Sequence, residues 1–238
     1  MDSIYKERFL RCLGILNERQ LARIRQTTLA VGGLGLGGSV FLNLVRMGFE
    51  KFHIADPDTF ERTNVNRQRG ARETTVGRRK DRTLADEALA INPDVRIKIF
   101  PEGVQDSNIF DFLDGVDWAV DIIDVFALPQ KIKFHQEARR RGIPVVSCAA
   151  VGFAGVVAVF DEGTPSFEEL TGMDPDAEPL ENLERFFRFI CPEIPEYMRE
   201  QTLRALNRET YIPFVVPGVE ISAAFATAEL VKGLLGWP

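Results

Sequence analysis

Four short segments between residues 31 and 80 carry groups suited to phosphate and sugar chemistry. Glycines fill most of positions 32–38, directly after an apolar run, and such a turn lets backbone N–H groups approach phosphates at a helix N-terminus. Three further segments follow in order: Asp56-Pro57-Asp58, Asn64-Val65-Asn66-Arg67-Gln68 and Val76-Gly77-Arg78-Arg79-Lys80. The ordered set predicts a phosphate cradle, a ribose acceptor and two cationic groups, and therefore a nucleotide site for chemistry at phosphorus.

Four side chains have expected roles at a bound triphosphate. Asp56 would accept hydrogen bonds from ribose hydroxyls, as the acid after the second strand does in dinucleotide-binding folds. Arg67 and Lys80 would neutralise negative charge as a bond at phosphorus breaks. Asp124 would hold Mg²⁺, which prefers carboxylate oxygen. The alternatives are a turn residue for Asp56 and a helix N-cap for Asp124.

The glycine turn can be aligned in two ways. Gly33-Leu34-Gly35-Leu36-Gly37-Gly38 fits the GxGxxG pattern. Counting from the end of the strand instead makes Gly32 and Gly37 the first and third glycines, with Leu34 in the second place. Glycines that pack a helix against a sheet would leave a similar sequence, so the turn has weight only together with the acids and cations that follow it.

Apolar periodicity predicts the elements that must position these residues. Strands are expected at 28–31, 51–55, 95–99, 118–123 and 145–149, and helices at 36–48, 77–91, 106–113 and 128–141. Their order predicts an α/β, Rossmann-like, doubly wound fold with a mostly parallel sheet and helices on both faces. Asp56 and Asp124 would both end strands, and the carboxyl ends of parallel strands share one edge of the sheet. We therefore expect the two acids to face one crevice.

We expect a single domain over residues 1–238, built from four parts. They are an N-terminal helical arm (1–27) in which Asn17 and Gln20 form a capping box, a nucleotide-binding core (28–160), a substrate-side insertion (161–213) and a C-terminal strand and helix (214–238). The insertion is polar, rich in phenylalanine and expected to hold one or two short helices that shape the substrate channel. The charge-free run 143–160 is interrupted by proline and glycines, so we interpret it as two strands joined near Gly152 rather than as a membrane helix.

Bulk composition narrows the possible functions. The 238 residues are 45% apolar, enough for a large core, and carry a net charge of −6, which disfavours broad nucleic-acid binding. Basic residues concentrate between Arg62 and Arg82, and the alternative for Arg78 and Arg79 is a solvated helix start. The N-terminus does not have the pattern of a signal peptide. We expect a cytoplasmic protein without a membrane association.

The cysteines and histidines are few and scattered. Cys12, Cys148 and Cys191 form no CxxC pair, so neither a zinc site nor a disulfide framework is expected. Cys191, in the insertion before a proline, is the plausible candidate for a catalytic thiol, while the other two cysteines are expected to pack in the structure. His53 and His135 are expected to be structural.

Together these segments resemble the ThiF/MoeB/HesA family, relatives of the ubiquitin-activating enzymes, over residues 5–160 and the last helix. The family's acid pair and NxxRQ element correspond to residues 56–68, and its VGxxK element to residues 76–80. Ile91-Asn92-Pro93 matches the end of a family helix, and the aspartate after the fourth strand falls on Asp124. The chain departs from the family in having Leu34 for a glycine, Val125 for a frequent asparagine, and none of the zinc cysteines of many members.

The resemblance implies an ATP-dependent adenylyltransferase. A carboxylate, usually the C-terminal glycine of a small ubiquitin-like or sulfur-carrier protein, would attack the α-phosphate of ATP, and pyrophosphate would leave. Arg67, Lys80 and Mg²⁺ on Asp124 would stabilise the transition state, and an N-terminal arginine, Arg11 or Arg8, would reach across a homodimer to the partner's ATP. The implied ATP-binding residues are Gly32, Gly33, Gly35, Gly37, Asp56, Asp58, Asn64, Arg67, Gln68 and Lys80.

Three other functions stay open. One is a tRNA-modifying enzyme of the same family that activates and dehydrates a threonylcarbamoyl group on adenosine. The pI near 5.2 counts against tRNA, because phosphate contacts need lysine and arginine. The second is a non-catalytic Rossmann scaffold, a function that does not account for Arg67 and Lys80. The third, an NAD-dependent dehydrogenase, explains the glycine turn and Asp56 but not those cations.

Overall fold

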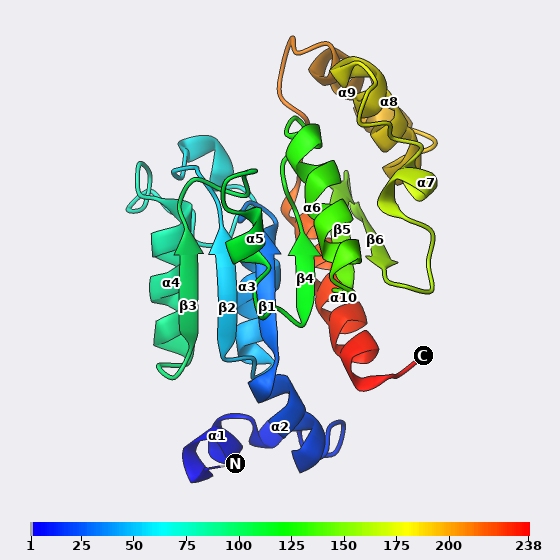
Figure 1. Cartoon of the computed structure of the whole chain (residues 1–238). Coiled ribbons are helices and arrows are strands. Elements are labelled where there is room, and N and C mark those ends of the chain that lie inside the picture. The colour runs from blue at the N-terminus through cyan, green and yellow to red at the C-terminus, as the bar shows by residue number, and fades with distance from the viewer. Residues whose placement is uncertain (1) are drawn as a thin grey trace.

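The chain folds around one six-stranded sheet, described for residues 2–238 of a computed structural model (Figure 1). Strand order is β3-β2-β1-β4-β5-β6, with β1–β5 parallel and β6 antiparallel to β5. The strands are β1 Thr28–Gly32, β2 Lys51–Ala55, β3 Arg96–Phe100, β4 Trp118–Asp121, β5 Val145–Val151 and β6 Ala154–Phe160. The predicted α/β fold with a mostly parallel sheet is confirmed, and the run 143–160 forms the β5–β6 hairpin.

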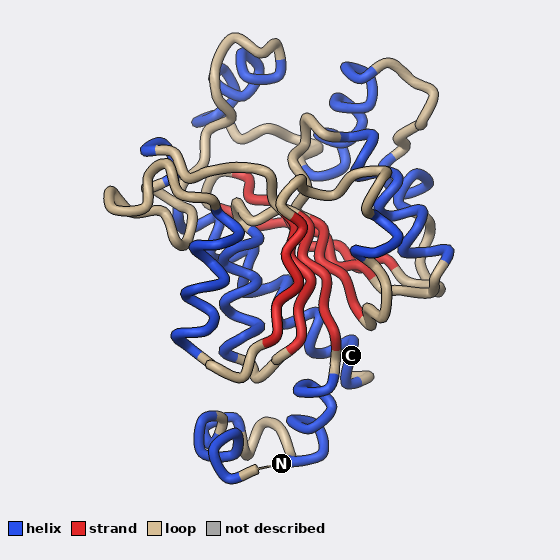
Figure 2. Tube along the Cα trace, turned by 60° about the vertical axis from the view of Figure 1, so that its left-hand side comes forward, coloured by secondary structure: helices blue, strands red, loops and turns tan. Residues whose placement is uncertain are grey.

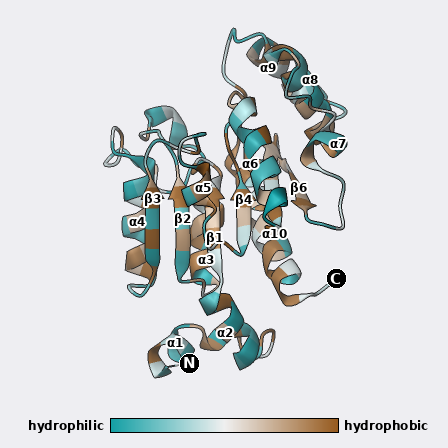
Figure 3. Ribbon diagram, in the orientation of Figure 1, coloured by the Kyte–Doolittle hydropathy of each residue, from teal (hydrophilic) through white to brown (hydrophobic). Residues whose placement is uncertain are grey.

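Helices cover both faces of the sheet because alternate strand residues point to opposite sides (Figure 2). Leu29 and Val31 join one buried cluster with α3 (Gly37–Arg46), α4 (Lys80–Ile91) and α10 (Val216–Leu235). Ala30, between them, joins a second cluster with α5 (Ile109–Phe112) and α6 (Leu128–Arg140). The strands carry hydrophobic residues, whereas the outer side of α6 is largely hydrophilic (Figure 3).

The N-terminal arm packs at the amino ends of the strands (Figure 1). It consists of α1 (Ser3–Arg8), the short 3₁₀ helix η1 (Leu10–Cys12) and α2 (Glu18–Gln26), which begins with the expected Asn17–Gln20 capping box. The Tyr5 side chain is buried, and its hydroxyl oxygen lies 2.8 Å from the Gly48 carbonyl oxygen at the end of the first crossover. This contact joins the arm to the core.

Several element boundaries differ from those expected. The helix expected from residue 77 begins at Lys80, because Gly77 has φ +82° and donates its N–H to the Phe60 carbonyl. The helix expected from 106 or 107 begins at Ile109, since the Asn108 side chain binds Gly103 O and Gln105 N–H. The strand expected through 123 ends at Asp121. Within residues 214–238, the expected strand is reduced to one bridge between Phe214 and Gly152.

The insertion holds three helices rather than the expected one or two. They are α7 (Phe167–Thr171), α8 (Pro179–Ile190) and α9 (Glu196–Leu206), at the same end of the sheet as the glycine turn (Figure 1). Phe167, Leu183 and Phe186 join the cluster under α6. No helix of residues 2–238 combines the length and the apolar character needed to cross a membrane.

Candidate functional site

The glycine turn lies in tight contact with the loop that follows β4. Gly33 has φ +86° and donates its N–H to the Ala55 carbonyl at 2.8 Å. A Cβ at this position would lie 2.1 Å from the Ile122 carbonyl oxygen, directly after β4. Only glycine fits that space and that backbone region. A Cβ at Gly35 would lie 3.3 Å from the Gln68 side chain. The turn therefore lies between the β4 loop and the NxxRQ segment.

Asp56, directly after β2, is a structural acceptor for that turn. Its Oδ2 accepts the Leu34 N–H at 2.6 Å and its Oδ1 accepts the Asp58 N–H at 2.9 Å. The side chain is buried, and burial raises the pKa of this carboxyl, although Lys80 and the two N–H groups oppose the rise. Asp56 therefore makes the hydrogen bonds expected of a turn residue. Its hydrogen bonding to a ribose remains a prediction.

Lys80 begins α4 next to these acids. Its Nζ donates to Asp58 Oδ2 at 2.8 Å, and its side chain is buried while that of Asp58 is exposed. Arg79 is occupied elsewhere: its guanidinium donates to Asp81, Asp56 O and Pro101 O. Arg79 therefore fixes the start of the helix rather than a ligand, and Lys80 is the cation whose charge opposes the rise in the pKa of Asp56.

The NxxRQ segment begins at the last residue of the 3₁₀ helix η2 (Arg62–Asn64), and its Asn64, Arg67 and Gln68 side chains point to different places. Asn64 is buried and its Oδ1 accepts the Glu61 N–H, a capping contact. Arg67 donates to Thr63 O at 2.9 Å, and its guanidinium lies 5.1 Å above the Phe214 ring centroid. Gln68 Oε1 is buried without a hydrogen-bond partner in residues 2–238. An acceptor of this kind needs a donor from a ligand or water.

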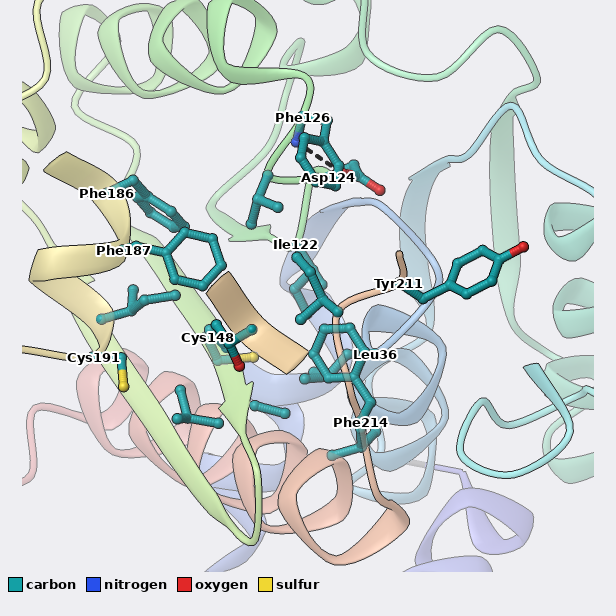
Figure 4. Close-up of a pocket in the computed structure, with 18 of the residues that line it drawn as sticks. Leu36, Ile122, Asp124, Phe126, Cys148, Phe186, Phe187, Cys191, Tyr211 and Phe214 are labelled. Atoms are coloured by element: carbon teal, nitrogen blue, oxygen red, sulfur yellow. Dashed lines mark hydrogen bonds between the residues drawn. The ribbon is translucent and has the colours of Figure 1, made fainter. Parts of the chain in front are cut away.

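Asp124 lies in the loop after β4, three residues beyond the strand rather than at its end. Its Oδ1 accepts the Phe126 N–H at 2.8 Å (Figure 4). The N-cap residue of α6 is Ala127, so the alternative that Asp124 caps this helix is wrong. The side chain is exposed. Nowhere in residues 2–238 do three His, Cys, Asp or Glu side chains gather as a metal site. One free carboxylate oxygen fits Mg²⁺ when phosphates supply the other ligands, which is how this ion is usually held.

A cavity of about 340 Å³ opens beside Asp124 and extends under the insertion (Figure 4). Of the predicted site residues, it brings together Arg67, Gln68 and Asp124, whereas Asp56, Asp58, Asn64, Lys80 and the site glycines do not line it. The sequence indicated that the insertion would shape a substrate channel but not which residues would line it. They come from the turn, the β4 loop, β5, α8, α9 and the segment before α10, and include Leu36, Ile122, Cys148, Val151, Phe186, Phe187, Ile190, Ile194, Met198, Ile212 and Phe214.

A buried ionic cluster supports the cavity floor. Lys131 Nζ lies 2.7 Å from both carboxylate oxygens of Asp121, and His135 Nε2 and Ser147 Oγ donate to the same carboxylate. Burial by itself would raise the pKa of Asp121, but Lys131 and His135 outweigh it and the pKa is lowered. Burial lowers the pKa of His135. Lys131 also lines the cavity, with its Nζ 5.4 Å above the Phe186 ring centroid.

Two of the three cysteines lie in the cavity wall. Cys148 is buried in β5 and Cys191 follows α8 (Figure 4). Burial raises the pKa of both thiols, and Cys191 Sγ contacts the Glu193 carbonyl oxygen at 3.4 Å. Neither environment favours the thiolate, which a catalytic cysteine requires.

The N-terminal arginines lie far from this end of the sheet. Arg8 donates to Asn92 Oδ1 at 2.6 Å and pairs with Asp94, while Arg11 is exposed and has no ion pair in the described chain. The full length of the strands separates this arm from the glycine turn (Figure 1). Arg11 therefore does not reach the site of its own chain.

The sequence profile of the ThiF family matches residues 7–238. The chain is 29% identical over 150 residues to the tRNA threonylcarbamoyladenosine dehydratase of Haemophilus influenzae, covering 62% of this chain and 57% of that protein. It is 29% identical over 164 residues to the sulfur carrier protein adenylyltransferase of Thermus thermophilus, covering 69% and 59%. The chain thus spans less than two thirds of the length of either relative.

Among solved structures, the E. coli tRNA N6-threonylcarbamoyladenosine dehydratase in complex with AMP superimposes with a TM-score of 0.74. The superposition covers 99% of this chain and 97% of the dehydratase chain. The two sequences are 19% identical, so the match shows a shared fold. The family profile extends over nearly the whole sequence, and these matches agree with it. The chain belongs to the ThiF family.

Proposed function

We propose that this chain is an ATP-dependent adenylyltransferase that activates a carboxylate. The observation that supports the proposal best is that Arg67 and Asp124 line one cavity, with the glycine turn packed against Ile122 and Gln68, which line the same cavity. A cation and a carboxylate able to hold a metal ion, together in one cavity, suit an α-phosphate and an attacking carboxylate. The names of the T. thermophilus relative and of the family's other adenylyltransferases agree with this reaction.

In the proposed reaction, a carboxylate oxygen attacks the α-phosphorus of ATP and the bond to the β-phosphate oxygen breaks, so that an acyl-adenylate and pyrophosphate form. Arg67 and Lys80 would neutralise the charge on the phosphates, and Asp56 would position the ribose. Asp124 would hold Mg²⁺, which supplies positive charge to the phosphate oxygens when bound. The residues then form a nucleotide side (Gly33, Asp56, Asp58 and Lys80) and an acyl side (the cavity from Arg67 and Asp124 to the inserted helices).

We infer that the carboxylate belongs to the C-terminus of a small carrier protein or peptide, in a cytoplasmic setting. The T. thermophilus relative carries the name of a sulfur-carrier adenylyltransferase, and the insertion that covers the cavity is a surface separate from the nucleotide side. The second candidate is a tRNA threonylcarbamoyladenosine dehydratase, favoured by the name of the H. influenzae relative and the E. coli fold match. The net charge of −6 counts against it.

ATP–pyrophosphate exchange tests the proposal and separates the two candidates. The full chain is incubated with Mg²⁺, ATP and labelled pyrophosphate, and receives in parallel a carrier protein ending in Gly-Gly, short peptides, or tRNA bearing threonylcarbamoyladenosine. Exchange with a protein or peptide that disappears when its C-terminus is amidated supports the first candidate. Exchange with tRNA alone supports the second. Nicotinamide reduction without any exchange would contradict both.

We further infer a homodimer in which Arg11 serves the partner's site. Its exposure and its distance from the glycine turn of its own chain support this arrangement. Arg11→Ala and Lys80→Ala should each be nearly inactive alone. Mixed after dissociation, they should regain activity, because one site of each mixed dimer has both residues intact. A mixture as inactive as its components would show that Arg11 does not act across the interface.

A further inference from the structure

The acyl side has no free charge beyond its mouth. Arg67 and Asp124 lie at the nucleotide end, and the third charged residue of the wall, Lys131, is neutralised by Asp121 at 2.7 Å. Deeper in, apolar side chains dominate, with Phe187 and Ile190 from α8 and Ile194 from the next loop among them. The Tyr211 hydroxyl points away from the other labelled side chains (Figure 4). Such a wall disfavours a charged or strongly polar group next to the reacting carboxylate.

The volume exceeds what a glycine tail needs. The cavity measures about 340 Å³, whereas an apolar cavity of roughly 150 Å³ already accommodates benzene. A Gly-Gly terminus has no side chain, so it would leave apolar walls without contacts, and unfilled apolar space forfeits both burial and dispersion energy. An aromatic or branched aliphatic side chain beside the carboxylate would fill it.

One buried hydroxyl in the wall independently points to a ligand. Thr202 of α9 lines the cavity, its side chain is 1% exposed, and its Oγ1 has no hydrogen-bond partner in the described chain. A buried hydroxyl without a partner is unfavourable. A single polar atom of a bound molecule, such as a peptide carbonyl oxygen, would satisfy it, which suits an acyl group that is apolar but continues into an amide.

We propose that the acyl group activated here carries a bulky apolar side chain next to its carboxylate, an inference that rests on the proposed adenylyltransferase function. The substrate is then a carrier protein or peptide whose last residue is leucine-, methionine- or phenylalanine-like rather than glycine. The inserted helices select that group, because they supply Phe187, Ile190 and Ile194, and the nucleotide side stays the same for any acyl chain.

Stable mimics of the acyl-adenylate test this selection without knowledge of the natural substrate. Three N-acylsulfamoyl adenosines are compared by calorimetry, with acetyl, 4-methylpentanoyl and 3-phenylpropanoyl groups. The two bulky compounds should bind at least about tenfold more tightly than the acetyl compound, since each buried methylene contributes. Equal affinities, or tighter binding of the acetyl compound, would overturn the inference and leave the adenylyltransferase intact. If none of the three binds and ATP does not bind either, the proposed function itself fails.

A matched pair of variants locates the selection. Ile194→Trp fills the cavity, whereas Leu203→Trp adds the same ring on the same insertion at an exposed position outside the cavity. Ile194→Trp should reduce the preference for bulky acyl groups to about twofold, while Leu203→Trp keeps the full preference. Circular dichroism and thermal unfolding confirm that both variants fold. A full preference in a folded Ile194→Trp would place the acyl group elsewhere and refute the proposal.

Discussion

The nucleotide side and the acyl side are stabilised by different forces. On the nucleotide side, polar groups already satisfy one another: Asp56 accepts two backbone N–H groups and Lys80 pairs with Asp58. On the acyl side, apolar walls face an open volume of about 340 Å³, and the polar atoms Gln68 Oε1 and Thr202 Oγ1 have no partner in residues 2–238. One side is held by its own polar contacts, whereas the other presents unfilled apolar space and polar atoms without partners.

This difference separates a region built from local contacts from one assembled from distant parts of the chain. The glycine turn and its acceptor, Asp56, lie within a short span of sequence and are joined by backbone contacts. The cavity walls come from segments as far apart as Leu36 and Phe214 and are held by packing. We therefore expect changes on the acyl side to alter substrate choice or stability, and changes on the nucleotide side to alter the rate of the chemical step.

The largest effect is expected at the ionic cluster beneath the cavity. Asp121→Ala would leave the Lys131 ammonium buried without its partner, which should lower the free energy of unfolding by about 3–5 kcal/mol. The double variant Asp121→Leu with Lys131→Met removes both charges and should recover most of that loss. Urea unfolding measures both. A double variant as unstable as the single one would show that packing, not the unpaired charge, sets the cost.

Lys80 should give the next largest effect, on rate rather than on stability. Lys80→Ala removes the cation beside Asp56 and should slow adenylation about 10²- to 10³-fold, the cost of losing one transition-state charge contact. Arg78→Ala is the matched control in the same segment, because Arg78 is exposed and has no ion pair in residues 2–238. Exchange rates of the two variants measure the contrast. Equal loss in both would mean that the positive charge of the segment, rather than one ammonium, matters.

Much of the nucleotide side could be predicted because its signals are local. The short apolar stretches ahead of the glycine turn and of Asp56 placed β1 and β2, helical spacing placed α3, and the Asn17–Gln20 cap formed as expected. Asp124 was harder. The chain leaves the sheet at Asp121, whose carboxylate turns inward to Lys131 and His135, and this long-range contact leaves no periodic signature near Asp124. The available signal for a buried acid near this point was the presence of Lys131 and His135, four residues apart, on an otherwise apolar helix face.

The acyl side could not be assembled from sequence. Phenylalanines in residues 161–213 indicated a role near the substrate, but not which of them would line a cavity. Phe187 faces it, whereas Phe167 packs under α6 against His135 with ring centroids 3.9 Å apart. That division depends on how α7 and α8 dock on the sheet. Phe214, which lies over Arg67, comes from a segment where a strand was expected.

A smaller effect is expected at His135, where a substitution should change how the free energy of unfolding depends on pH. Burial holds the pKa of His135 below 6.5, so the unfolded chain takes up a proton there before the folded chain does. Stability from this residue is therefore present above pH 6.5 and lost as the pH falls below it, by at most about 1.4 kcal/mol per pH unit. His135→Gln should make the decline between pH 7 and 5 shallower. His53, whose pKa burial also lowers, leaves a residual slope. An unchanged decline in the variant would show that His135 is already protonated in the folded protein.

The smallest effect is expected at Cys191, which belongs to the acyl side by position but not by chemistry. Burial raises the pKa of its thiol, and the thiol donates its hydrogen bond to the Glu193 carbonyl rather than facing a cation, so the thiolate needed for acyl transfer is disfavoured. Cys191→Ser should change ATP–pyrophosphate exchange less than about twofold and unfolding by less than about 0.5 kcal/mol. Cys191→Phe, which narrows the same wall, should weaken binding of the bulky acyl mimics. A thioester trapped on the wild type but not on Cys191→Ser would contradict this, because it would make the insertion a catalytic element as well as a selective one.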